Sequence, residues 1–114
     1  MTQMFAQGDL LIERIADVEP TGTIVSPDAS GAIVLAEGEL TGHRHVIFES
    51  VTMFRDDALA RELPTGLYVG HVKVGEAGAN VVHQEHAPVR LEQGTYRVRR
   101  QRELEPKDAV LVAD

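Results

Sequence analysis

The chain has 114 residues, a formal net charge of −7, five histidines and no cysteine. This length suits one hydrophobic core, so we expect a single domain over residues 1–114. The content of 43% apolar and 25% charged residues is typical of a globular protein and excludes a wholly disordered one. The lack of cysteine excludes disulfide scaffolds, thiolate zinc sites, iron–sulfur clusters and cysteine nucleophiles. Any metal must therefore be bound by histidine and carboxylate side chains.

The sequence also narrows the partners and the compartment. It contains no apolar run as long as the roughly 18 residues of a membrane span, and no basic-then-apolar signal segment. We therefore expect a cytoplasmic protein with no membrane partner. Residues 1–57 hold ten acidic and three basic side chains, whereas residues 58–114 hold eight of each sign. This balance argues against nucleic acid as a partner, because binding a polyanion needs a positive field.

Short strands separated by glycine and proline dominate the predicted elements. In chain order we expect strands at 10–15, 32–36, 45–54, 67–74, 79–83 and 95–102, and the irregular stretch 17–30 has room for another at 23–25. Only 56–62 and 106–112 resemble helical turns, and the adjacent acids Asp56 and Asp57 are expected to cap the first of these. The pattern predicts an all-β fold, a small barrel or sandwich of about seven or eight short strands.

The first of two close histidine pairs lies near the middle of the chain. His43 and His45 are separated by one residue, so in an extended segment both side chains project from the same face. Glu49 follows on that face and offers a carboxylate. Imidazole and carboxylate ligands suit Zn, Fe, Ni or Mn, so this spacing predicts a divalent metal site.

The second histidine pair, His83 and His86, is separated by two residues. On a flat strand the two side chains would point to opposite faces, so both can reach one site only if the strand ends or bulges between them. Pro88 favours a strand end there. We therefore predict His83 and His86 as the later metal ligands. Two alternatives stay open: histidines that bind no ligand, and protonated histidines that bind an anion.

The segment around the first pair resembles the cupins, a family of small metal-binding β-barrels. The likeness rests on His43-Arg44-His45 followed by Glu49, the histidine and glutamate spacing of the first cupin motif. Of the second motif, Pro64-Thr65-Gly66 is present, while His71 comes two residues late and the asparagine is not in place. The resemblance implies a metal on His43, His45, Glu49 and a later histidine. The segments 36–45, 83–88 and 94–98 also resemble small bacterial and phage proteins, which implies no activity.

A basic run near the end of the chain is the second local feature. Arg97, Arg99, Arg100 and Arg102 fall within six residues of a predicted strand. One interpretation is a solvated face whose arginines pair with the many acids. The other is a site for a small anionic ligand, because the arginine fork suits phosphate and carboxylate. In that case the ligand-binding residues would be Arg97, Arg99, Arg100 and the separate histidine, His71.

These patterns leave three hypotheses for function. The first is a small β protein with a histidine-lined metal or polar ligand site, with the question of metal-dependent enzyme activity left open. The second is a non-enzymatic module without metal that binds a partner or self-assembles, because exposed sheet edges favour pairing. The third is anion binding by histidines and the basic strand. We also expect a homo-oligomer.

Overall fold

The computed structural model describes residues 3–38, 41–61, 63–64 and 66–101. Its regular structure consists of ten strands and one short 3₁₀ helix. They are β1 (Met4–Gln7), β2 (Leu10–Ile15), β3 (Thr23–Val25), β4 (Ile33–Glu37), β5 (Arg44–Ile47), β6 (Thr52–Arg55), η1 (Asp57–Leu59), β7 (Tyr68–Val74), β8 (Ala79–Val82), β9 (Val89–Leu91) and β10 (Gly94–Arg100). The predicted all-β fold is confirmed. The helical turn expected at 106–112, and Arg102, lie outside the described residues.

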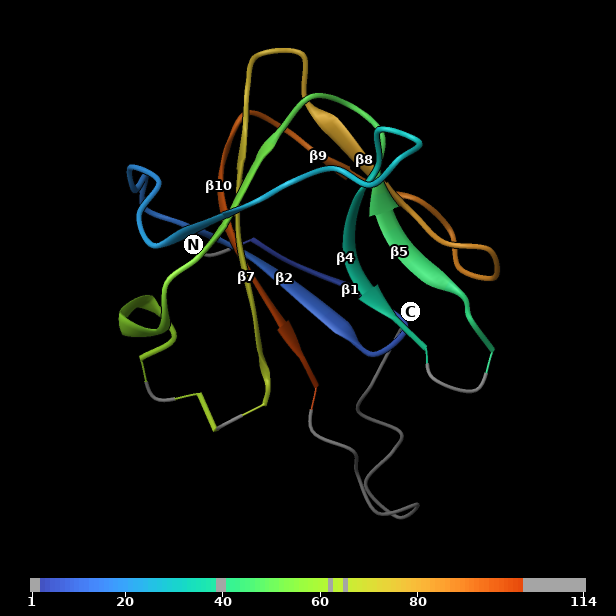
Figure 1. Ribbon diagram of the computed structural model, residues 1–114, viewed down its shortest axis with the longest axis horizontal. Coiled ribbons are helices and arrows are strands. Elements are labelled where there is room, and N and C mark those ends of the chain that lie inside the picture. Colours follow the sequence, from blue (N-terminus) through green and yellow to red (C-terminus); the bar gives the residue numbers. More distant parts are fainter. Residues whose placement is uncertain (1–2, 39–40, 62, 65, 102–114) are drawn as a thin grey trace.

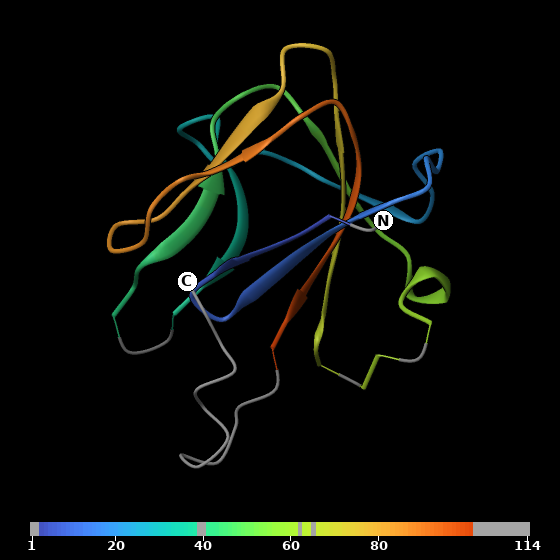
Figure 2. The ribbon, with the colours of Figure 1, turned by 180° about the vertical axis from the view of Figure 1, so that it is seen from behind.

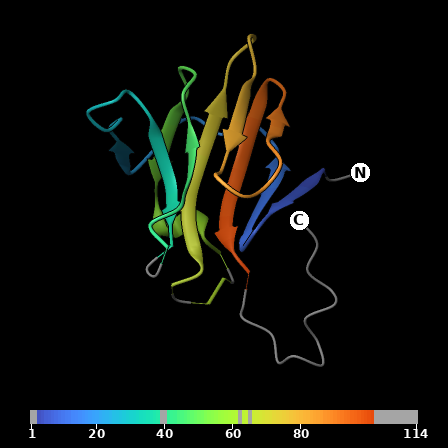
Figure 3. The same cartoon turned by 90° about the vertical axis from the view of Figure 1, so that its right-hand side faces the viewer.

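The strands form two antiparallel sheets (Figure 1). The larger has six strands in the order β1-β2-β10-β7-β6-β3, and the smaller has four in the order β4-β5-β8-β9. Seen from the side, most strands of both sheets run along one common direction of the molecule (Figure 3). No helix in the described part of the chain is long and apolar enough to cross a membrane.

One hydrophobic core joins the inward faces of both sheets. The larger sheet contributes Ile12, Val72 and Val98, and the smaller sheet contributes Ile47 and Val81, all fully buried within one cluster. Alternation along each strand follows from the two-residue period of extended backbone. Along β10, for example, the core residue Val98 is flanked by arginines on the opposite face.

The segment expected as one strand at 45–54 is in fact two strands in different sheets. β5 belongs to the smaller sheet and β6 to the larger one, with residues 48–51 crossing between them. The crossing allows Ile47 and Met53 to bury their side chains in the same core from opposite sides. Phe48, at the crossing, is 60% exposed. An apolar run alone does not reveal such a crossing, because both halves have the composition of strands.

Three short features complete the comparison with the sequence. The edge strands β1 and β9 were not predicted, whereas β3 lies at the expected 23–25. The expected helical turn near 56–62 is the helix η1. Asp56 caps it as predicted, since its Oδ1 accepts a hydrogen bond of 3.0 Å from the Ala58 N–H.

Candidate functional site

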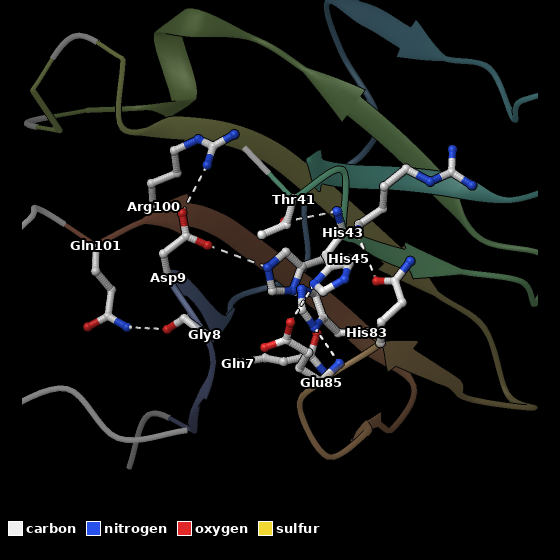
Figure 4. Close-up of polar contacts among 12 residues, drawn as sticks. Gln7, Gly8, Asp9, Thr41, His43, His45, His83, Glu85, Arg100 and Gln101 are labelled. Atoms are coloured by element: carbon white, nitrogen blue, oxygen red, sulfur yellow. Dashed lines mark hydrogen bonds and ion pairs between the residues drawn. The ribbon is translucent and has the colours of Figure 1, made fainter. Parts of the chain in front are cut away.

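Three connections meet at one corner of the molecule and form a histidine-lined cavity. They are the β1–β2 turn, the approach to β5, and the β8–β9 loop at 83–88, which lie together in Figure 1 and, from behind, in Figure 2. The cavity has a volume of about 300 Å³. Its lining includes all four paired histidines together with Asp9, Glu85 and Arg100. Figure 4 shows most of these side chains.

The four histidine rings lie close to one another. The ring centroids of His45 and His83 are 4.4 Å apart, those of His83 and His86 are 4.6 Å apart, and those of His43 and His83 are 5.6 Å apart. His83 therefore contacts the other three rings. Both members of the second pair reach the cavity because β8 ends at Val82, before either histidine.

His45 is the anchored member of the cluster. It is 4% exposed, and its Nδ1 lies 2.8 Å from Oε1 of the buried Gln7. Both hydrogens of the Gln7 amide are committed, because Nε2 donates to the backbone oxygens of Val81 and Ala87 at 3.0 and 2.8 Å. The Gln7 oxygen must therefore accept, and His45 Nδ1 must donate. In the neutral ring, Nε2 then carries the lone pair.

The lone pair of His45 faces a carboxylate. His45 Nε2 lies 3.4 Å from Oδ1 of Asp9, in the turn between β1 and β2. Burial, and then the neighbouring His83, lower the pKa of His45 from 6.5 to about 4. His45 is therefore neutral at pH 7, and two acceptor atoms face each other across this gap.

His43 is held in the same tautomer by a different partner. Its Nδ1 lies 2.8 Å from Oε1 of Glu85 in the β8–β9 loop. An ionised carboxylate only accepts hydrogen bonds, so Nδ1 carries the proton, and the lone pair of a neutral His43 is on Nε2. The His43 side chain is 31% exposed, which gives it more freedom than His45.

His83 has the opposite tautomer to His43 and His45. Its Nδ1 accepts a hydrogen bond of 3.0 Å from the Glu85 backbone N–H, so a neutral His83 carries its proton on Nε2. Burial, followed by the charges of His86 and His43, lowers the pKa of His83. His86 packs against the β1–β2 turn, where a Cβ atom added to Gly8 would lie 2.8 Å from His86 Nε2.

Three residues around the histidines were not singled out from the sequence. Asp9, in the β1–β2 turn, and Glu85, between the second pair of histidines, line the cavity, whereas Gln7, the last residue of β1, bonds to His45 without lining it. Arg100 Nη1 pairs with Oδ2 of Asp9 at 3.0 Å, which leaves Oδ1 facing His45. Of the three, only Glu85 could have been found from the sequence, by its position between His83 and His86.

Glu49 does not lie among the four histidines. β5 ends at Ile47, so the alternation that would have kept Glu49 on the face of His43 and His45 stops before it. Its carboxylate instead accepts hydrogen bonds from the backbone and side chain of Asn80 at 3.2 and 2.8 Å. Cupin membership, for which Glu49 is a ligand, stays a prediction.

The remaining ligand candidates lie on the larger sheet. Arg97 and Arg99 both pair with Glu13, whereas Arg100 lies in the histidine cavity. His71 is 1% exposed, bonds to Tyr68 and lies on β7 of the larger sheet, outside the lining of the histidine cavity. The basic run is thus divided between two places, and each of these three arginines has a carboxylate partner.

The histidine cavity offers nitrogen and oxygen donors, but they are not gathered around one point. Among the described residues, no group of three or more histidine, aspartate or glutamate side chains is arranged to hold a metal ion. What the arrangement provides is one fixed imidazole, His45, with a carboxylate and a second imidazole on more exposed side chains around it.

The fold and this cavity define a small two-sheet β domain with a histidine-rich corner. Residues 6–101 match a family described as a domain of unknown function, DUF8820. The match covers most of the chain, which therefore belongs to this family. No curated protein and no solved structure matches the chain.

Proposed function

We propose that the protein binds a divalent transition metal, such as zinc, nickel, iron or manganese, in the histidine cavity. The ligands would be His43 Nε2, His45 Nε2 and a carboxylate oxygen of Asp9. The observation that carries the proposal is the shared tautomer of His43 and His45. Each donates its Nδ1 hydrogen to an oxygen atom, from Glu85 and Gln7 respectively, so each has a lone pair on Nε2.

This hydrogen-bonding pattern is the one found behind metal-binding histidines. A ligand histidine generally donates its second ring hydrogen to a carboxylate or carbonyl, which fixes the tautomer and raises the basicity of the free nitrogen. Histidines that serve only as surface residues have no need of such a partner on the same ring atom. The amide of Gln7 is especially well fixed, since it is 1% exposed and uses every hydrogen-bonding group.

With this tautomer, the facing acceptors of His45 and Asp9 also support the proposal. A lone pair and a carboxylate oxygen at 3.4 Å repel each other unless a positive charge lies between them. A divalent cation would satisfy both. The side chains of His43 and Asp9 are 31% and 58% exposed, so rotation toward the fixed His45 costs little packing.

The proposal gives the second histidine pair a supporting role. His83 packs against both proposed ligand rings, and its own Nδ1 is occupied by the Glu85 N–H. Three protein ligands leave coordination positions open, and an open position is what lets a metal polarise a substrate or activate water. A site of this kind is therefore compatible with the metal-dependent enzyme activity that the sequence analysis left as an open question.

Calorimetric titration of tag-free, metal-depleted protein with zinc and nickel tests the proposal. We expect one equivalent to bind, and metal at a hundred times its dissociation constant to stabilise the fold by about 2.7 kcal/mol. His43→Ala and Asp9→Ala should each weaken binding at least tenfold, while Asp57→Ala, an exposed acid on η1, should not. Absence of binding, or equal binding by all variants, would contradict the proposal.

A second candidate function, self-assembly through sheet edges, has one observation in its favour. Met4 and Ile24, which are 50% and 56% exposed, lie on β1 and β3, the two outer strands of the larger sheet. Exposed apolar edge strands are templates for pairing with another chain. Sedimentation analysis of the wild type and of Ile24→Lys tests this candidate. An oligomer that the substitution dissociates without changing metal affinity supports it, and a monomeric wild type excludes it.

A further inference from the structure

The outer face of the larger sheet carries a second polar site, independent of the histidine cavity. Strand register aligns Glu13, Arg97, His71 and Phe54 in a row across β2, β10, β7 and β6. These residues alternate with core residues, so the row faces away from the smaller sheet. Two of its members, His71 and Phe54, are nevertheless almost completely buried, at 1% and 0% exposure.

Two segments, one after β2 and one including η1, cover this row of residues, and a cavity remains between them and the sheet. Ala16 and Val18 follow β2, and Leu59 belongs to η1. Together with Ile15 they form apolar walls around a space of about 250 Å³. The polar lining is entirely basic or neutral, and consists of Arg61, His71 and Arg97.

Arg97 has hydrogen-bonding capacity to spare in this cavity. Its Nε and Nη2 bind Glu13, and its Nη1 donates to the Ala60 backbone oxygen at 3.2 Å. A guanidinium has five N–H groups, so two remain without a partner among the described residues. One is on Nη1 and the other on Nη2 of the same guanidinium, a group that readily binds carboxylates.

His71 adds a neutral donor. Tyr68 Oη accepts a hydrogen bond from the Asp56 N–H at 3.2 Å and lies 2.8 Å from His71 Nδ1. The phenol hydrogen is then directed to Nδ1, which leaves the imidazole hydrogen on Nε2. Burial, and next the charge of Arg97, lowers the pKa of His71, so the ring is neutral at pH 7.

Arg61 brings a second positive charge to the same cavity. Its φ of 57° is in the left-handed region, and it is the one non-glycine residue of the described chain with a positive φ. It directly follows Ala60, the residue that ends η1. Positions of this kind cost a long side chain some backbone strain, which is often found at functional sites.

We propose that this cavity binds a small monocarboxylate with a short aliphatic chain. The carboxylate would meet the spare N–H groups of Arg97, the imidazole N–H of His71 and the charge of Arg61. The aliphatic chain would lie against Ile15, Val18 and Leu59. The small volume excludes a nucleotide, and the apolar walls favour an organic acid over inorganic phosphate.

Nuclear magnetic resonance titration of the full chain with butyrate tests this inference. We expect saturable binding in the millimolar range, as befits so small a ligand. The shifts should centre on the Arg97 guanidinium and the His71 ring. Butyramide and butylammonium, which share the chain but not the charge, should bind far more weakly. Equal binding of butyramide, no saturable shift, or shifts confined to the histidine cavity would overturn the inference.

Two variants separate a specific site from general charge attraction. Arg61→Gln removes a charge from an exposed side chain and should weaken butyrate binding about two- to fivefold. Arg90→Gln, which removes an exposed charge from β9 in the other sheet, should have no effect. Arg97→Lys keeps the charge beside Glu13 but loses the fork, and should weaken binding more than Arg61→Gln. Equal effects of the Arg61 and Arg90 variants would also overturn the inference.

Discussion

Gly8 sits where the β1–β2 turn touches the histidine rings, and two constraints act on it. Its φ is +58°, which L side chains rarely adopt, and a Cβ there would lie 2.8 Å from His86 Nε2 and 3.3 Å from His45 Cε1. The first constraint concerns the backbone alone. The second links this turn to the cavity, since any side chain at position 8 displaces the imidazoles.

Gly8→Ala is therefore predicted to destabilise the fold and to disturb metal binding. Gly31→Ala is a matched control, because Gly31 has φ +86° and no atom within 4 Å of an added Cβ. The control should cost about 1 kcal/mol of backbone strain, and Gly8→Ala measurably more. Urea unfolding of both variants gives the comparison. Equal losses of stability would show that the turn does not support the rings.

The buried histidines make stability depend on pH. Burial is the main reason that the pKa values of His45, His71 and His83 are lowered, and that of His45 falls from 6.5 to about 4. Below pH 6.5 the unfolded chain takes up protons that the folded chain does not. The contribution of the neutral histidines to the free energy of unfolding is thus fully present above pH 6.5 and decreases as the pH falls toward 4.

Urea unfolding of metal-free protein at pH 7.5, 6 and 5 measures this effect. We predict a steady loss, of which His45 accounts for up to about 3 kcal/mol once the pH is below its folded pKa. The lowered pKa of Asp28 acts only at more acidic pH, below its ordinary value of 3.8. Constant stability between pH 7.5 and 5 would mean that these imidazoles are protonated in the fold.

At the level of elements, the short helix η1 depends on a single cap. Asp56 accepts hydrogen bonds from the Ala58 N–H and from the Thr21 hydroxyl, at 3.0 and 2.7 Å, and so ties η1 to the chain before β3. Asp56→Ala should lower the free energy of unfolding by about 1 kcal/mol. Asp57→Ala should change it by less than about 0.5 kcal/mol, as expected of an exposed site. Thermal unfolding of the two variants checks this, and equal melting temperatures would contradict the capping role.

The strands were predictable to the extent that their signal is local. Alternation and glycine punctuation indicated most strands, including β7 and β10, because side-chain period depends only on neighbours in the chain. The division of 45–54 between two sheets was not predictable, since it is decided by what each half packs against. The edge strands β1 and β9 are short and mixed in composition, so their strand character depends on their partners.

The histidines of the candidate site were predictable from the sequence. The residues that orient their rings were not. The spacing of His43 and His45 predicted that they share one face. Pro88 indicated a strand end, which allows the second pair to turn toward the first. Gln7 gave no signal, because a glutamine in an edge strand is usually solvated. Its role arises only when the fold brings it within reach of His45, Val81 and Ala87.

At the scale of the whole molecule, the arginines of β10 are divided between two separate sites. The basic run of β10 contributes Arg97 to the outer face of the larger sheet and Arg100 to the histidine cavity. The histidine cavity joins segments around residues 8, 44 and 85, which are far apart in the sequence. A metal held by Asp9, His43 and His45 would link two of these segments directly, and the third through the contact of Glu85 with His43, and so would stabilise the fold.

The central claim is that His43 and His45 present Nε2 lone pairs that bind a metal ion. Long-range proton–nitrogen correlation spectra of the imidazole rings, recorded at pH 7.5 with and without equimolar zinc, test it most directly. We predict that metal-free His43 and His45 carry their proton on Nδ1, and His83 on Nε2. Zinc should shift the Nε2 signals of His43 and His45 while each Nδ1 keeps its proton. A proton on Nε2 of His45, or spectra that zinc leaves unchanged, would contradict the account.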